Sequence, residues 1–432
     1  MILLLGMLLA MDPQAGLPRD VLLLARIKQK VQQMAAQVTD YTCLETIERS
    51  ARDSAQRPFR PVDVLRLEVG VVGKKEVYSW PGAEKFEERG PSDIVSAGTV
   101  STGEFMQSLR AVFISNTATI RWRGEEELNG RPALRYDYSL PLFGFRWHVA
   151  LAGGSGEVRA EGSFWADADT MDILRLEARA ADIPPGLPLE EMTSRTDYGM
   201  MQLRGTAVWL PQSAELTLRE LGGKESRNRI EFSHCRQYSG SSSLLLTEVP
   251  PEPAAPAQAA LVPFDVPAGL TLSMQLESEV DSSKSRVGDL LEARLTADAE
   301  LRKKVIIPKG AKIRGRLRRL EKSSEGTPHF VVGLEFAEIE FAPKRGLFFG
   351  RLQSMDQVAG LRWMLSSSSQ KADRLSGGSL MQGTTVNTTH TENRYVQDLP
   401  GVGTFFMTGT QFRLPRGLKM IWQTVELPRR PR

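Results

Sequence analysis

The stretch Val249–Ala260, V-P-P-E-P-A-A-P-A-Q-A-A, divides this chain of 432 residues into two parts. Its four prolines cannot continue a helix or pair in a central strand. With alanine between them they form an extended, semi-rigid spacer. On both sides of the spacer the chain alternates between short strand-like runs and turns. We therefore predict two β-rich domains, over residues 17–248 and 263–432, joined by a linker over residues 249–262.

The side-chain periodicity predicts a mostly β protein of the α+β class. In the first domain, Leu65, Leu67 and Val69 alternate with polar residues, which is the period of a half-buried strand. Residues 17–38 carry an apolar stripe at spacings of three and four, which predicts an amphipathic helix. Ser101, followed three residues later by Glu104, is a capping box that predicts a second helix. We expect an antiparallel sheet with both helices packed on it.

The second domain repeats one turn device three times. In each copy, proline sets the turn, glycine supplies a position of positive φ, and an alternating strand follows. This pattern predicts a small β-barrel or sandwich. The copies are V-P-A-G-L-T-L (Val266–Leu272), I-P-K-G-A-K-I (Ile307–Ile313) and L-P-R-G-L-K-M (Leu414–Met420).

Composition places the chain among globular proteins, with 41% hydrophobic and 25% charged residues. The net charge of +3 points to no particular partner, and we expect no nucleic acid. The first ten residues are an apolar run, shorter than the roughly 20 residues that span a bilayer. The run suits a signal peptide. We therefore predict a signal-peptide-like segment over residues 1–16, no transmembrane span, and a periplasmic or outer-membrane-associated protein.

Two cysteines, Cys43 and Cys235, lie in strand-like stretches at the two ends of the first domain. In an exported protein, such a pair is typical of a disulfide. The alternative is two buried free thiols.

Three pieces of the first domain resemble the LolA/LolB-type periplasmic lipoprotein carriers. They are Glu127–Tyr138 (E-L-N-G-R-P-A-L-R-Y-D-Y), Phe164–Leu176 and Val208–Leu216. The resemblance implies a half-barrel whose helical lid covers an apolar cavity for acyl chains. As a hypothesis, we line this cavity with six inward residues: Leu65, Leu67, Val69, Phe105, Leu109 and Trp165.

The second domain resembles the C-terminal β-barrel of TrbI-like proteins of conjugation and type IV secretion channels. The likeness rests on the Ile307–Ile313 device and on the V-G-D-L-L-E-A-R-L run that precedes it. Residues 366–403 form an insert rich in Ser, Thr, Gly and Asn, which we interpret as a mobile loop rather than a membrane-inserting helix pair. The resemblance implies a barrel module that docks to another envelope protein.

A basic strand runs through this barrel, with its charges on one face. It offers a contact for anionic lipids or envelope polymers, or else a solvated face that protects a sheet edge. Its charged residues are Lys312, Arg314, Arg316 and Arg318.

Catalytic motifs are missing from the sequence. There is no G-x-S-x-G elbow, P-loop or G-x-G-x-x-G, and we expect no enzyme, cofactor or metal. Asp167, Asp169 and Asp172 lack the glycine and distant glutamate of a calcium-binding EF-hand, and they favour a plain hairpin turn. The histidines are scattered singly, at His148, His234, His329 and His390.

Two classes of function fit these patterns. The first is a non-enzymatic envelope protein that binds an apolar ligand or lipid in the half-barrel and docks to a partner through the barrel. The second is a scaffold or secretion-system accessory protein that binds only other proteins.

Overall fold

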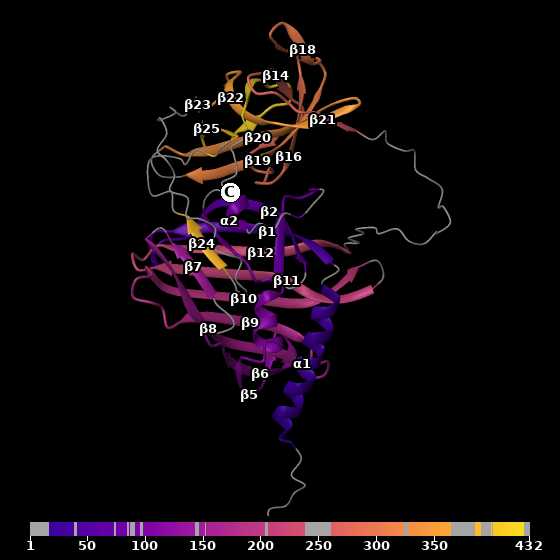
Figure 1. Ribbon diagram of the computed structural model, residues 1–432. Helices are drawn as coiled ribbons and strands as arrows, with labels where there is room; N and C mark the ends of the chain where they lie inside the picture. Colours follow the sequence, from indigo (N-terminus) through magenta and orange to yellow (C-terminus); the bar gives the residue numbers. More distant parts are fainter. Residues whose placement is uncertain are drawn as a thin grey trace, which may run out of the picture.

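A computed structural model describes residues 17–38, 41–72, 75–83, 86, 91–95, 98–142, 147–151, 153–203, 206–237, 261–323, 327–363, 385–389, 399 and 401–426. These residues form two β-rich lobes (Figure 1). The predicted segment 1–16 and linker residues 249–260 lie outside the described residues, as does most of the insert. The mostly β fold class is confirmed.

The first lobe is one long antiparallel sheet accompanied by the long helix α1 and by shorter helices (Figure 1). Its strands run in the order β3-β2-β1-β12-β11-β10-β9-β8, and β8 also pairs with β6 and β7. The helices are α1 (Arg19–Val38), α2 (Pro91–Ile94), α3 (Gln107–Leu109) and the π-helix η1 (Arg110–Ile114). The strands are β1 (Tyr41–Arg52), β2 (Arg60–Val72), β3 (Lys75–Ser79), β4 (Gly98–Ser101), β5 (Thr119–Leu128), β6 (Arg131–Ser139), β7 (Trp147–Leu151), β8 (Gly154–Asp167), β9 (Ile173–Ala181), β10 (Leu189–Leu203), β11 (Thr206–Glu220) and β12 (Glu225–Gln237).

Strand β1 lies inside the sheet, between β2 and the much later β12. The predicted disulfide joins these two distant segments, linking Cys43 of β1 to Cys235 of β12. Cys43 is fully buried. The covalent bond therefore holds together the first and last strands of the lobe.

Helix α1 follows the predicted apolar stripe. Ile27, Val31 and Met34 are buried, and the helix packs against η1 and β11. At its N-terminal end, the Tyr136 hydroxyl donates a hydrogen bond to the carbonyl of Asp20, at 2.8 Å. The dipeptide Asn129-Gly130 predicts a hairpin turn, and the turn forms between β5 and β6 with both residues at positive φ.

The predicted capping box at Ser101 and Glu104 was wrong. Ser101 ends strand β4, and the helix begins only at Gln107, with no side-chain cap from its own N-cap residue. The carboxylate that meets this helix start comes from Glu76 on β3 instead. A tertiary contact thus replaces the local one that the sequence pattern favoured.

The second lobe is a curved sheet with the strand order β13-β21-β20-β19-β16-β14-β27-β22. β25 also pairs with β20 and β23. The strands are β13 (Val262–Pro263), β14 (Thr271–Leu276), β15 (Val280–Asp281), β16 (Leu290–Leu295), β17 (Ala299–Leu301), β18 (Lys304–Ile307), β19 (Lys312–Ser323), β20 (His329–Phe341), β21 (Lys344–Leu347), β22 (Phe349–Met355), β23 (Leu361–Trp363), β24 (Thr385–Thr389), β25 (Val402–Thr408), β26 (Arg413–Leu414) and β27 (Lys419–Val425).

The three repeated turns form as predicted. Gly269, Gly310 and Gly417 all have φ between +84° and +89°, and each precedes a core strand, respectively β14, β19 and β27. The three strands lie in one sheet.

The insert over residues 366–403 is not only a loop. Within it, β24 pairs in antiparallel fashion with β4 and in parallel with β7 of the first lobe (Figure 1). The sequence pattern did not predict this strand, because its partners lie more than 200 residues away in the chain.

The lobes also meet at an open stretch of β2. Strand β3 pairs with β2 only at Glu68–Val72, so β3 leaves the β2 edge at Val64–Arg66 without a partner. Val287 of the second lobe fills this edge with two backbone hydrogen bonds, of 2.9 and 3.0 Å, to Arg66 and Val64. Gly288 follows at φ +102°, where an added Cβ would lie 2.5 Å from the Arg66 carbonyl oxygen.

Among the described residues, no helix is long and apolar enough to cross a membrane.

The disulfide yields a first prediction. Replacing both cysteines by serine should lower the free energy of unfolding by about 2–4 kcal/mol, because the bond closes a long loop in the unfolded chain. Urea unfolding measures the change. The wild type in reductant should match the variant. An unchanged unfolding midpoint in both would contradict the prediction.

Candidate functional site in the half-barrel interior

Five of the six predicted cavity residues come together in the interior of the first lobe. Leu65, Leu67 and Val69 point inward from β2, and Phe105 and Leu109 belong to the same core. Each is at most 1% exposed. The segment over residues 103–114, here called the cover segment, contributes the last two side chains.

Trp165 lies elsewhere. It packs with Ala133 and Leu174 in a separate cluster, while its neighbour Phe164 belongs to the main core. Because successive strand residues face opposite sides of a sheet, Phe164 occupies the inward position that the prediction gave to Trp165.

Aromatic rings pack closely beneath the cover segment. Phe105 meets Phe232 of β12 with ring centroids 5.6 Å apart, and Phe113 meets Phe164 at 4.7 Å. These contacts bind the cover segment to the sheet through apolar surface.

A group of carboxylates shares this interior. Glu45 of β1 lies opposite Leu67 on β2 and opposite Phe232 on β12, and it is 2% exposed. Its Oε2 atom is buried without a hydrogen-bond partner in the described part of the chain. Burial, together with the nearby Glu104 and Glu76 carboxylates, raises the pKa of Glu45 well above its usual range.

Glu76 anchors the cover segment. Its carboxylate accepts hydrogen bonds from the backbone N–H groups of Gly103, Met106 and Gln107, at 2.7–2.9 Å. It also accepts the Tyr78 hydroxyl, at 2.7 Å. Met106 and Gln107 lie at the helix start, where backbone N–H groups lack partners within the helix, and the carboxylate satisfies these two as well as that of Gly103.

Glu104 sits in the cover segment and is 3% exposed. Burial raises its pKa to about 7; the nearby Ser101 hydroxyl opposes the rise, and the Glu76 charge adds to it. Neither Glu104 oxygen has a hydrogen bond of ordinary geometry to a described residue. The interior therefore holds a carboxyl group that changes charge near neutral pH.

Two tyrosines face the same carboxylates. Burial raises the pKa of Tyr78 and Tyr198 far above the usual tyrosine range, and the charge of Glu76 adds to both shifts. The Tyr198 hydroxyl is buried with no hydrogen bond of ordinary geometry to a described residue.

Sequence reasoning missed this polar group. One signal was present, because Glu45 shares the alternation of Cys43 and Ile47 and thus faces inward with them. Glu76 and Glu104 gave no such signal, since their neighbours are set by the tertiary fold. Over the described residues, no three His, Cys, Asp or Glu side chains are grouped to hold a metal ion.

Three of the four residues of the predicted basic stripe form contacts with other parts of the protein. Arg314 is bonded to Glu338 and Glu340 at 2.9 and 3.0 Å. Arg318 is bonded to Glu335 at 2.7 Å and lies over the Trp80 ring of the first lobe.

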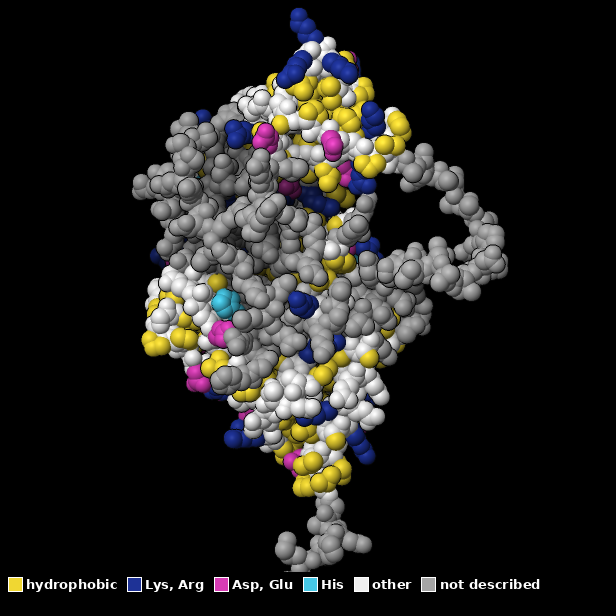
Figure 2. Space-filling model, viewed as in Figure 1, with side chains coloured by type: hydrophobic (Ala, Val, Ile, Leu, Met, Phe, Trp, Pro, Cys, Tyr) yellow, Lys and Arg dark blue, Asp and Glu magenta, His cyan; other side chains and the backbone are white. Residues whose placement is uncertain are grey.

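The remaining two members of the stripe differ from each other. Arg316 donates to the Gly288 carbonyl, and burial lowers its pKa. Lys312 is exposed. Three of the four side chains therefore have contacts that suit a structural role. Figure 2 shows lysine and arginine side chains distributed over both lobes on the face in view.

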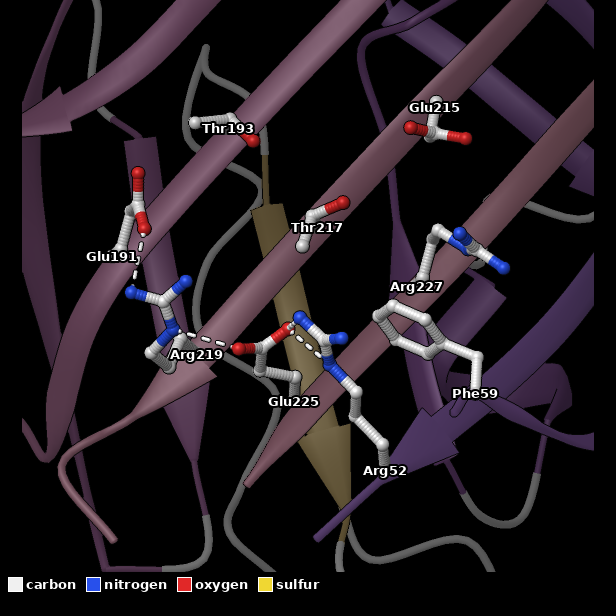
Figure 3. Close-up of a pocket in the computed structure, with 9 residues that line it drawn as sticks. All are labelled: Arg52, Phe59, Glu191, Thr193, Glu215, Thr217, Arg219, Glu225 and Arg227. Atoms are coloured by element: carbon white, nitrogen blue, oxygen red, sulfur yellow. Dashed lines mark hydrogen bonds and ion pairs between the residues drawn. The ribbon is translucent and has the colours of Figure 1, made fainter. Parts of the chain in front are cut away.

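A pocket of about 260 Å³ lies at residues of β1, β10, β11 and β12, away from the core (Figure 3). Arg52 and Arg227 lie over the Phe59 ring, at 4.4 and 4.0 Å from its centroid. The buried Glu225 accepts hydrogen bonds from Arg219 and Arg52 at 2.8 and 2.7 Å. Burial alone would raise the pKa of Glu225, but these two arginines hold it below its usual value. This network of charged hydrogen bonds connects β1, β11 and β12.

The acidic stretch after β8 is a turn. The Asp167 carboxylate accepts hydrogen bonds from the backbone N–H groups of Asp169 and Thr170, at 3.0 and 2.9 Å. These bonds form the hairpin turn that was predicted in preference to a calcium-binding loop.

His390 lies outside the described residues. His148, His234 and His329 lie on three separate strands, β7, β12 and β20.

Comparison with known proteins gives matching solved structures, three of which are described here. No family model matches the chain, and neither does any curated protein. A DUF1329 family protein from Desulfovibrio piger is 14% identical, with a TM-score of 0.26, and the match covers 51% of this chain and 95% of that one. An outer membrane lipoprotein-sorting protein domain from Vibrio parahaemolyticus is 12% identical, with a TM-score of 0.25 and coverages of 50% and 94%. Lipoprotein LppX of Mycobacterium tuberculosis is 12% identical, with a TM-score of 0.19 and the same coverages. At TM-scores this low, the matches carry no argument about this chain.

Glu76 yields a second prediction. Glu76→Ala removes the acceptor for three backbone N–H groups and should cost about 1–3 kcal/mol of stability. Amide hydrogen exchange should accelerate at Gly103, Met106 and Gln107. Lys75→Ala, at the exposed neighbour on β3, is the control and should leave these rates unchanged. Equal rates in both variants would refute the anchoring role.

Glu104 yields a third prediction. Its folded-state pKa of about 7 lies above the ordinary value of 4.5, so the folded protein retains a proton that the unfolded chain loses. The free energy of unfolding should therefore fall between pH 4.5 and about 7 and stay low above that. Glu104→Gln should remove up to about 3 kcal/mol of this fall.

Urea unfolding at a series of pH values from 5 to 8 tests the prediction about Glu104. Glu48→Gln, on the exposed side of β1, is the control. If the two variants showed the same pH dependence, Glu104 would not be the responsible group.

Proposed function

We propose that this protein is a non-enzymatic binding protein of a bacterial cell envelope. Its half-barrel holds an apolar ligand or lipid, and its second lobe docks to an envelope partner. The observation that carries the proposal is an apolar interior, closed by a short cover segment, that retains buried polar atoms without partners.

The cover segment is suited to displacement. It contacts the sheet through Phe105, Leu109 and Phe113, and it is anchored through Glu76. An acyl chain that took the place of these side chains would exchange one apolar contact for another, which keeps the free-energy difference small. The ligand therefore enters beneath the cover segment, where Phe105 now packs on Phe232.

The disulfide supports export, because such bonds persist in oxidising compartments. Together with the apolar first ten residues and the LolA/LolB-type sequence pieces, it favours a periplasmic or outer-membrane-associated protein. The TrbI-like turn repeats favour a docking role for the second lobe.

A scaffold function is the second candidate. The close ring packing beneath the cover segment and the backbone bonds between the lobes favour it, since both suit a rigid protein that binds only other proteins.

A fourth prediction separates the two candidates. Protein purified from a bacterial periplasm should release a stoichiometric apolar molecule into organic solvent, detected by mass spectrometry. Leu67→Arg should abolish this release, because its guanidinium group occupies the interior and meets Glu45. Circular dichroism checks that the variant is folded. A clean extract from the wild type would favour the scaffold.

A further inference from the structure

The half-barrel interior contains buried polar atoms that the described residues do not pair. Oε2 of Glu45, both carboxylate oxygens of Glu104 and the Tyr198 hydroxyl are buried without a hydrogen bond of ordinary geometry to any described residue. The three residues are 2%, 3% and 6% exposed. Native proteins leave few buried polar atoms unpaired, and each costs about 1–3 kcal/mol.

The Glu76 carboxylate, in the same interior, has hydrogen-bond donors for both of its oxygens. Both of its oxygens are used by backbone N–H groups and by Tyr78. Oε2 of Glu45 has no such donor, and the donors beside Glu104 are the Ser101 hydroxyl and its own backbone N–H. The hydroxyls of Ser101 and Thr196 lie near Glu104 and Tyr198 without hydrogen-bond geometry.

The charges in this interior share one sign. The titratable groups that face Glu104 are Glu45, Glu76, Tyr78 and Tyr198, and none is basic. Arg49, also on β1, is bonded to Asp63 at 2.6 Å. A missing cation would satisfy the spare oxygens and offset the repulsion between carboxylates.

The apolar side chains around Glu45 indicate the chemistry of the rest of the ligand. Glu45 lies between Leu67 and Phe232, and Phe105 packs against Phe232. A molecule that reaches Glu45 and Glu104 must therefore pass its body through apolar side chains. We infer that the half-barrel binds an amphipathic ligand with an ammonium head group; this inference rests on the proposed function. The ammonium group binds Glu45 and Glu104, and the Tyr198 hydroxyl lies beside it. The apolar chain of the ligand replaces contacts of the cover segment.

Three probes of equal chain length test the head group. Dodecylamine, dodecanol and dodecanoate are titrated into the intact, disulfide-bonded protein by calorimetry at pH 7. Dodecylamine should bind at least about tenfold more tightly than dodecanol, which is about 1.4 kcal/mol. Dodecanoate should bind most weakly.

Two glutamine variants test whether Glu45 and Glu104 cause the preference for dodecylamine over dodecanol. Glu45→Gln and Glu104→Gln keep the side-chain shape and should each reduce the preference for the amine while dodecanol still binds. Glu48→Gln, facing outward on the same strand, should leave the preference intact. In the wild type, calorimetry in two buffers of different ionisation enthalpy should show proton release with the amine, because the cation favours the ionised carboxylates. This measurement requires no variant to fold.

The outcomes separate the two proposals. If all three probes bind alike, water satisfies the spare oxygens and the head-group inference is overturned, while the proposed binding of an apolar ligand stands. A preference for the amine that survives both glutamine variants also overturns it. If no probe binds, the proposed ligand-binding function fails and the inference fails with it.

Discussion

The rest of the first lobe depends on the pairing of β1 with β12. These strands are separated by most of the domain, yet they exchange backbone hydrogen bonds along their length and share the Cys43–Cys235 disulfide. The pairing makes β1 an inner strand, with β2 on its other side. Every inward side chain of β1 is therefore surrounded by sheet, which a strand at the sheet edge would not be.

That position explains the chemistry of the interior. Glu45 lies on the inward face of β1 and is desolvated from both neighbouring strands, so its charged form is disfavoured. The cover segment adds Glu104, and β3 adds Glu76. The Glu76 carboxylate accepts hydrogen bonds that anchor the cover segment, whereas Glu45 and Glu104 have buried oxygens without a hydrogen-bond partner among the described residues. The same contacts that close the lobe thus leave a polar site within it.

The two lobes are joined by more than the linker. Val287 extends the open edge of β2, β24 joins the first lobe's sheet, and Arg318 lies over Trp80. Arg318 of the basic strand also donates a hydrogen bond to the Ile94 carbonyl of the first lobe. The motion of the cover segment that the proposed ligand entry requires would therefore take place against a sheet that both lobes hold.

The sequence by itself determined the local structure. Alternation predicted the strands, Asn129-Gly130 and the three Pro-x-Gly turns predicted their reversals, and the apolar stripe predicted α1, because each depends on neighbouring residues. Five of the six predicted cavity residues also lie together in the interior. Only the tertiary structure decided the rest: the late start of α3, the outward side of Trp165, strand β24, and the meeting of Glu45, Glu76 and Glu104. These features depend on residues brought together from distant parts of the chain, and burial and charge act through distance in space rather than along the sequence.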